Sequence, residues 1–310
     1  MSRESNVPDE PNEPDEPNER NEPNEPNEPN EPSALTEHDH LNEHGELTKS
    51  SAVSPDDAVL SYLDEGVGEP LVLLHAWCGD SSHFLPQVEH FRAHHRVIVP
   101  DLPWHGASSR TRTLTIESMA EAVIWLLREQ LDVEAAHFVG HSMGAFVVAK
   151  ISDNRDGLVR SFTALDSGFA IHADWSAGLD EHVAALQRDG YLEAQAALTE
   201  TGLLLDSDDT AVRGKILGEM RRTSQSLLVE GQRTMIAFER ADSDRIIAGL
   251  TVPLAIVSSQ NPVSDLDRLA AMVPHARFEH FTGYGHYLQL LVPAAVNAVI
   301  AETVAVASGD

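Results

Sequence analysis

The sequence predicts an α/β protein whose mostly parallel β-sheet is covered by helices on both faces. Short apolar segments, such as residues 71–74 and 136–139, alternate along the chain with longer helical segments. Strands that are apolar on both faces are typical of parallel sheets, because the crossover helices bury both sides. With 310 residues and 42% apolar side chains the chain can build one large core, so we expect one α/β domain that carries an insertion.

The expected strands and helices follow one another in a regular order. Residues 58–63 and 71–74 are apolar segments on either side of a glycine-containing turn, so we expect the domain to open with a hairpin. The elements that follow are a helix at 84–91, a strand at 97–99, a helix at 116–130, a strand at 136–139, a helix after residue 142, a strand at 161–165, a strand at 254–257, a helix at 265–272, a strand at 277–281 and a closing helix at 293–306. Residues 171–247 have a helical pattern with no strand, and we expect them to be an insertion.

The N-terminal segment has a different composition. Residues 11–32 repeat Pro-Asn-Glu with small variations. This segment has no apolar side chains that could offset the entropy lost on folding, and its prolines exclude an α-helix. We therefore expect residues 1–50 to be a disordered acidic tail, residues 51–170 together with 248–310 to form the α/β core, and residues 171–247 to be the helical insertion.

The net charge of −29 limits the partners that the protein can have. Residues 1–50 carry 15 Asp and Glu against three Arg and Lys, and the rest of the chain is acidic as well. Phosphate-rich surfaces would repel such a chain, so we expect neither nucleic acid nor a membrane as a partner. A small-molecule substrate is the expected ligand, and the sequence leaves both a monomer and a homo-oligomer open.

The single cysteine, Cys78, excludes an internal disulfide and a cysteine-based zinc site, and we expect neither a metal nor an organic cofactor. No segment approaches the roughly 20 consecutive apolar residues that a membrane-spanning helix needs. The N-terminal residues also lack the basic and then apolar layout of a signal peptide. We therefore expect the protein in the cytoplasm.

Ser142 is the candidate nucleophile. It is the central residue of Gly140-His-Ser-Met-Gly144, which stands between the strand at 136–139 and a helix that begins near Ala145. A serine in a sharp turn between strand and helix crowds its neighbours, so glycine is favoured two positions before and two positions after it. The strained turn lifts the hydroxyl away from the backbone and toward a substrate. This reading is preferred to a serine that merely caps the helix.

Four segments together resemble the α/β-hydrolase family. They are the strand and loop at 71–77, the turn Pro-Asp-Leu-Pro-Trp-His-Gly at 100–106, the pentapeptide around Ser142, and Gly-Tyr-Gly-His at 283–286. They occur in the order and spacing of that family, and the resemblance covers residues 55–307. It implies an α/β-hydrolase fold with a sheet of about eight strands and with a helical cap at residues 171–247.

A serine hydroxyl needs a neighbouring base at neutral pH. His286 lies in a glycine-containing loop after the last expected strand, and the chain order of serine, acid and histidine fits, so we assign it as the base in preference to His141. The resemblance implies that the backbone N–H groups of Trp77 and Met143 form the oxyanion hole. We also expect Trp77, His141 and Trp175 to line the substrate pocket.

The acid is the point at which the sequence departs from the family. The family's acid follows the strand at 254–257, and the matching residues 258–262 contain no carboxylate. Two alternatives are Asp166, directly after the preceding strand, and Asp265 or Asp267 at the start of the following helix. Neighbouring strand ends lie about 5 Å apart, so an acid one strand over still reaches the histidine. We therefore favour Asp166.

The leading hypothesis is a carboxylic ester hydrolase that cleaves a small ester, thioester or lactone through an acyl-serine intermediate. A competing hypothesis is that the chain resembles the cofactor-free dioxygenases that cleave hydroxy-oxoquinoline-type rings, which Trp77-Cys78, Asp166 and Ser259-Gln260 suggest. There His286 would act as the base and the serine would only bind substrate, although Met143 departs from that group's second histidine. A third hypothesis is a non-catalytic small-molecule receptor on the same fold.

Overall fold

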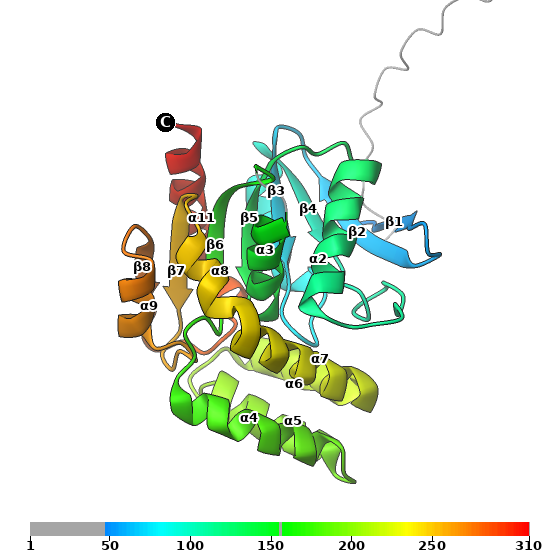
Figure 1. The fold of residues 1–310 in the computed structure, drawn as a ribbon, viewed down its shortest axis with the longest axis vertical. Coiled ribbons are helices and arrows are strands. Elements are labelled where there is room, and N and C mark those ends of the chain that lie inside the picture. The colour runs from blue at the N-terminus through cyan, green and yellow to red at the C-terminus, as the bar shows by residue number, and fades with distance from the viewer. Residues whose placement is uncertain (1–46, 155–156, 310) are drawn as a thin grey trace, which may run out of the picture. The chain divides into compact units, whose positions relative to one another are not determined.

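The computed structural model describes residues 47–154 and 157–309, and it confirms the predicted eight-stranded, mostly parallel sheet (Figure 1). The strand order is β1-β2-β4-β3-β5-β6-β7-β8. The pairs β1/β2 and β2/β4 are antiparallel, and the other five pairs are parallel. The strands are β1 (Ser50–Val53), β2 (Val59–Glu65), β3 (Glu69–Leu74), β4 (His95–Pro100), β5 (Ala136–His141), β6 (Val159–Leu165), β7 (Leu254–Ser258) and β8 (Arg277–His280).

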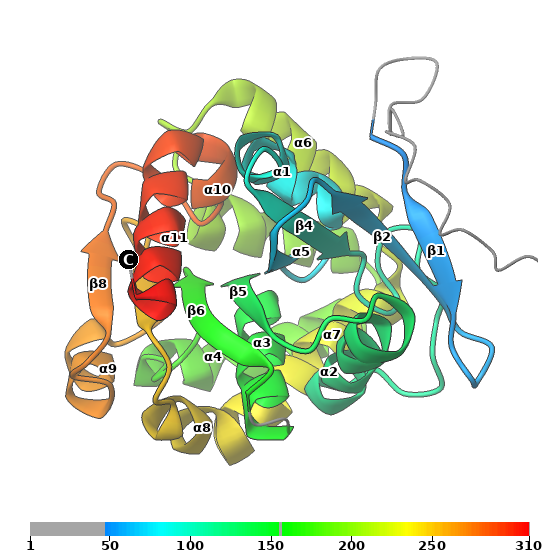
Figure 2. The ribbon, with the colours of Figure 1, turned by 90° about the horizontal axis from the view of Figure 1, so that it is seen from above.

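Helices cover both faces of this sheet (Figure 2). The helices α1, α10 and α11 lie on one face, and α2, α3 and α8 lie on the other. The bounds are α1 (Leu85–Phe91), α2 (Ile116–Trp125), α3 (Met143–Asn154), α8 (Asp244–Gly249), α9 (Leu266–Met272), α10 (Leu288–Leu291) and α11 (Pro293–Ser308), with the short helices η1 (Ser81–Phe84) before α1 and η2 (Leu126–Gln130) after α2. None of the helices within residues 47–154 and 157–309 is both long and apolar enough to cross a membrane.

The strand β3 shows why a continuous apolar run is needed at the centre of such a sheet. Leu71 and Leu73 pack into the hydrophobic cluster beneath α1 and α11, and Val72 and Leu74 pack into the cluster beneath α2 and α3. All four side chains are fully buried. Successive side chains of a strand point to opposite faces, so a strand with helices on both sides must be apolar at every position.

The expected hairpin between residues 58–63 and 71–74 is wrong. β2 pairs with β1 and with β4, whereas β3 pairs with β4 and with β5. The hairpin at the start of the domain is instead β1 with β2, in the register Val53 to Val59. The apolar pattern identified the strands, but a strand buried on both faces gives no signal of which neighbour it will pair with.

Ordered structure also begins earlier than residue 51. Ser50 is the first residue of β1, and the Lys49 ammonium donates to both carboxylate oxygens of Asp101, at 3.0 and 2.7 Å. The same carboxylate accepts hydrogen bonds from the backbone N–H groups of Ser81 and Ala107. Asp101 therefore joins three segments of the core. Residues 1–46 of the expected tail lie outside the described residues.

Between β6 and β7 the described chain contains only helices and loops. Four of these helices gather beyond the end of the sheet to which the parallel strands point (Figure 1). They are α4 (Ala173–Leu186), α5 (Tyr191–Leu198), α6 (Thr210–Arg222) and α7 (Gln225–Phe238), with the short turns η3 (Thr199–Leu203) and η4 (Glu239–Ser243) after α5 and α7. We call residues 173–243, which comprise these four helices, the two turns and the loops that join them, the cap.

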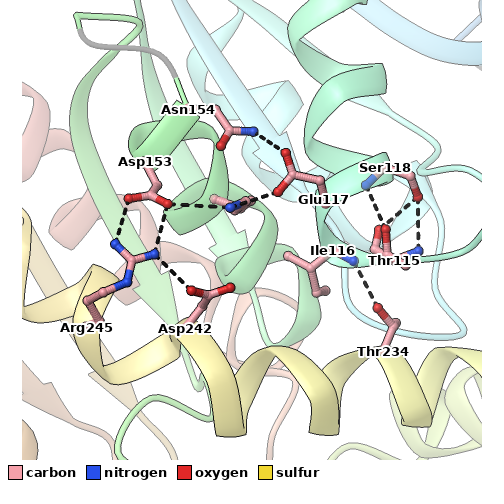
Figure 3. Close-up of polar contacts among 10 residues, drawn as sticks. Thr115, Ile116, Glu117, Ser118, Asp153, Asn154, Thr234, Asp242 and Arg245 are labelled. Atoms are coloured by element: carbon pink, nitrogen blue, oxygen red, sulfur yellow. Dashed lines mark hydrogen bonds and ion pairs between the residues drawn. The ribbon is translucent and has the colours of Figure 1, made fainter.

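Hydrogen bonds fasten the last part of the cap to the core helices α2 and α3 (Figure 3). The backbone N–H of Ile116, the first residue of α2, has no partner within its own helix. It donates to the hydroxyl of Thr234 on α7 at 2.9 Å. After the cap, Arg245 donates to both carboxylate oxygens of Asp153 on α3, at 3.0 and 3.1 Å, and to Asp242 at 2.9 Å. The position of α7 over the sheet is therefore fixed from the core side.

Candidate active site

Ser142 occupies the sharp turn between β5 and α3 that the pentapeptide predicts. Its φ is +52°, in the left-handed region that non-glycine residues rarely adopt, and its backbone N–H donates to the carbonyl of Leu165 on β6 at 2.9 Å. A methyl group at Gly144 would collide with the carbonyl of Leu74, and one at Gly140 would collide with Ala145. The two glycines are therefore required by the close approach of the turn to its neighbours.

His286 lies against Asp166. Its Nδ1 is 2.6 Å from Oδ2 of Asp166, and both residues are buried, with 5% and 3% of their surface exposed. The carboxylate can accept from Nδ1–H, which leaves the lone pair of Nε2 available to take a proton. Asp166 itself is held at a φ of +40°, with its backbone N–H donating to Val257 at 2.7 Å.

Ser259 donates two hydrogen bonds to the Asp166 carboxylate. Its backbone N–H donates to Oδ1 of Asp166 at 2.8 Å, and its hydroxyl donates to Oδ2 at 2.8 Å. Ser259 follows β7 directly, at the strand end where the family usually has its acid. Asp166 stands one strand over, and the end of β7 supplies hydrogen bonds to it in place of a carboxylate.

The two alternative acids lie elsewhere. Asp265 is the N-cap of α9, where its side chain accepts from the backbone N–H of Arg268 at 3.0 Å. Asp267 is in the first turn of the same helix. Of the three candidate carboxylates, the structure brings only Asp166 within hydrogen-bond distance of His286 among the described residues.

Ser142, His286 and Asp166 line one cavity of about 100 Å³ beneath the cap. This is below the ~300–1,000 Å³ of typical ligand pockets, which favours a small substrate. Trp77, Met143 and Trp175 line it as well. The remaining lining residues are mostly apolar, and α7 and η4 contribute Met235 and Ile236 together with the polar Gln232 and Glu239.

The geometry at the expected oxyanion hole is consistent with two free donors. In residues 47–154 and 157–309 the backbone N–H groups of Trp77 and Met143 have no hydrogen-bond acceptor, although both residues are buried. The indole N–H of Trp77 donates to the carbonyl of Leu227 on α7 at 3.2 Å, which ties the loop after β3 to the cap. Free N–H groups that face a cavity can stabilise an oxyanion formed there.

No hydrogen bond within the described part of the chain joins the hydroxyl of Ser142 to His286. Such contacts are often long in unliganded enzymes and shorten in the reacting complex. Both side chains border the same small cavity, and the Nε2 side of the imidazole is the side not occupied by Asp166. A substrate carbonyl placed in this cavity would lie beside both groups.

His141, expected in the substrate pocket, is placed behind His286 and away from the cavity. It is fully buried, and its ring centroid is 4.5 Å from that of His286. Its Nε2 is 3.0 Å from the carbonyl of His286, and its Nδ1 is 3.0 Å from the amide nitrogen of Gln289. The pKa of His141 lies well below its usual range. Burial is the larger cause, and the charge of the neighbouring His286 is the next. A neutral ring satisfies both hydrogen bonds, so this residue supports the histidine loop.

Asp208, which the sequence analysis did not single out, also holds the histidine loop. Its Oδ1 accepts from the backbone N–H of Gly285 at 2.9 Å, and its Oδ2 accepts from Leu205 at 2.8 Å. The carbonyl of Leu203 accepts from the backbone N–H of His286 at 2.7 Å. A segment of the cap thus holds the loop that carries His286. A single Asp in an acidic helical segment gives no signal of such a role.

The family model of the alpha/beta hydrolase fold matches residues 69–293. The dihydrolipoyllysine-residue acetyltransferase component of an acetoin cleaving system from Pseudomonas putida is 30% identical over 57% of this chain, which spans about half (46%) of that relative. A pimeloyl-[acyl-carrier protein] methyl ester esterase from Xanthomonas campestris is 27% identical over 71% of this chain and 89% of its own.

The solved structures agree on the fold. An enol-lactonase from Burkholderia xenovorans superposes with a TM-score of 0.71 at 18% identity, and the match covers 82% of this chain and 99% of that one. The family match spans most of the folded chain and includes the serine turn and the histidine loop. The chain therefore belongs to the α/β-hydrolase family.

Proposed function

We propose that the protein is a serine hydrolase that cleaves a small, largely apolar ester or lactone through an acyl-serine intermediate. The observation that carries this proposal is the buried Asp166–His286 pair, at 2.6 Å, bordering the same cavity as Ser142 in its strained turn. The relatives named as a methyl ester esterase and an enol-lactonase support this class of substrate.

The reaction follows from these groups. His286 Nε2 takes the proton of the Ser142 hydroxyl as its oxygen attacks the substrate carbonyl, and the carbonyl electrons move onto oxygen. The backbone N–H groups of Trp77 and Met143 stabilise that oxyanion. The C–O bond to the leaving group then breaks, and His286 returns the proton to the departing alkoxide. Water, deprotonated by the same imidazole, hydrolyses the acyl-serine and regenerates the enzyme.

Asp166 orients the imidazole and stabilises its protonated form during this cycle. The acid keeps its place because Ser259 donates two hydrogen bonds to it. The apolar cavity walls exclude water from the reacting groups, so the charges that develop there interact more strongly than in bulk solvent.

The test is labelling with a fluorophosphonate, together with turnover of p-nitrophenyl acetate and butyrate, for the wild type, Ser142→Ala and His286→Ala. Labelling and turnover should both be lost in Ser142→Ala and strongly reduced in His286→Ala. Ser226→Ala, at an exposed position on α7, is the matched control and should behave as the wild type. A wild type that is neither labelled nor active on any ester would contradict the proposal.

The position of the acid favours one second candidate, a cofactor-free dioxygenase. Asp166 follows β6 instead of β7, and His286 beside it could remove a proton from a ring hydroxyl. Oxygen uptake with hydroxyquinolones separates the two reactions, because Ser142→Ala should abolish ester hydrolysis but only weaken the oxygenation. If the wild type shows neither activity and yet binds a small molecule tightly, a receptor on this fold is the remaining explanation.

A further inference from the structure

One face of α7 and its continuation η4 forms a wall of the cavity. Gln232, Met235, Ile236 and Glu239 all line it. Their spacing of three, four and seven residues places them on a single face of a helix. Two of the four are polar, although the cavity is otherwise largely apolar.

These two polar side chains have no partner in the described part of the protein. Gln232 is only 5% exposed, and its side-chain amide makes no hydrogen bond within residues 47–154 and 157–309. One carboxylate oxygen of Glu239, Oε2, is buried and also lacks a hydrogen-bond partner there. Buried polar atoms are nearly always paired in native proteins, so the unpaired Oε2 of Glu239, with the Gln232 amide on the same wall, points to a ligand that enters the cavity.

The nearby cations do not neutralise Glu239 directly. Arg240 donates to both carboxylate oxygens of Asp180, at 3.2 and 2.9 Å, and Arg268 is paired with Asp244. Burial raises the pKa of Glu239, and these two arginines oppose that rise from a distance. A carboxylate in this environment gains most from a hydrogen-bond donor that enters the cavity, and most of all from a cationic donor.

The two groups mark two points along the cavity. Gly231 is in contact with the indole of Trp77, so Gln232 follows directly after the position on α7 that packs against an expected oxyanion-hole residue. Glu239 lies seven residues further along the same face, and seven helical residues advance about 10 Å. A substrate that reaches from the serine along this wall would meet Gln232 first and Glu239 near its far end.

We propose that Gln232 and Glu239 select an acyl substrate whose far end carries a hydrogen-bond donor, an amine in preference to a hydroxyl. The inference rests on the proposed function, because the far end is defined relative to a carbonyl bound at Ser142. Apolar chains fill the middle of the cavity against Met235 and Ile236, and an acidic far end is repelled by Glu239.

The test compares p-nitrophenyl esters of unsubstituted acyl chains of four, six and eight carbons with their terminal amino, hydroxy and carboxy derivatives. At the best chain length, kcat/KM should fall in the order amino, hydroxy, unsubstituted, carboxy. Glu239→Gln should lower kcat/KM for the amino ester by about tenfold relative to that of the unsubstituted ester, mainly through KM. Glu230→Gln, at a half-exposed position of α7 where Glu230 pairs with Arg233, is the matched control and should leave this order unchanged.

The failures of the two proposals are distinguishable. Hydrolysis of unsubstituted esters with no preference among the derivatives at any length overturns the selection by Glu239 and leaves the serine hydrolase standing. If no ester is turned over, calorimetry tests separately whether Glu239 binds an amine. The ligands 6-aminohexanamide and hexanamide are each titrated into the Ser142→Ala variant and into the double variant that also carries Glu239→Gln. Tighter binding of the amine that disappears with Glu239→Gln supports the site, and equal binding of both amides to Ser142→Ala overturns it.

Discussion

Asp208 of the cap accepts a hydrogen bond from the backbone N–H of Gly285, at 2.9 Å, one residue before His286, the proposed base. A methyl group at Gly285 would collide with the Asp208 carboxylate and lie 2.7 Å from the carbonyl of Leu203. The cap therefore has two functions in this structure. It closes the cavity over the serine, and it holds the histidine loop through the hydrogen bonds of Asp208 and Leu203.

This contact predicts a role for Asp208 in turnover. Asp208→Ala should lower kcat for p-nitrophenyl butyrate by about tenfold or more with a smaller change in KM, because small displacements of a catalytic group are costly. Asp208→Asn should be less severe, since one amide oxygen can still accept. Asp206→Asn, a fully exposed neighbour, is the control. Equal kcat values in all four proteins would show that the histidine loop holds its position without the cap.

The Asp166–His286 contact predicts which carboxylate is the acid. Asp166→Asn should reduce kcat by about 10³–10⁴-fold, because the amide cannot hold the imidazole in the same tautomer. Asp265→Asn should leave kcat close to that of the wild type, since asparagine also caps a helix well. Circular dichroism would establish that both variants are folded. A greater loss of kcat in Asp265→Asn would contradict the assignment.

The serine turn predicts a difference between two glycines in helices. Gly144→Ala should destabilise the protein by about 1–3 kcal/mol or more, because the added methyl group overlaps the carbonyl of Leu74. Gly214→Ala, inside α6 with open space around it, should be neutral or stabilise by up to about 1 kcal/mol. Urea denaturation measures both. The prediction fails if the two substitutions have the same effect on the free energy of unfolding.

The buried histidines predict that stability falls in mild acid. Burial lowers the pKa of His75, of His105 (to about 3) and of His141, so the folded protein resists protonation that the unfolded chain accepts near its usual pKa of about 6.5. The unfolded state then binds more protons below that pH, and the free energy of unfolding should fall by up to about 1.4 kcal/mol per pH unit for each histidine. Urea denaturation between about pH 7.5 and 5 measures the slope. A flat profile would contradict these pKa shifts.

Much of the architecture could be predicted from local patterns. Apolar runs such as residues 71–74 identified central strands. The Gly140–Gly144 pentapeptide identified the turn that carries Ser142, because such a crowded turn requires small residues on either side of the serine. The pairing of β2 with β4 in place of β3 was not predictable in this way. Strand neighbours depend on how the whole chain packs, and no short segment encodes them.

The residue patterns alone indicated the α/β class, the serine in its turn and the histidine that could serve as its base, since each depends on residues close together in the chain. They favoured Asp166 among three carboxylates, but only the folded arrangement shows which one meets His286, because Asp166 and His286 are 120 residues apart. It also placed His141 behind the base, Asp208 beside Gly285, and the unpaired Gln232 and Glu239 along the cavity. These relationships arise where distant segments pack together, and burial and hydrogen-bonding partners exist only once they have done so.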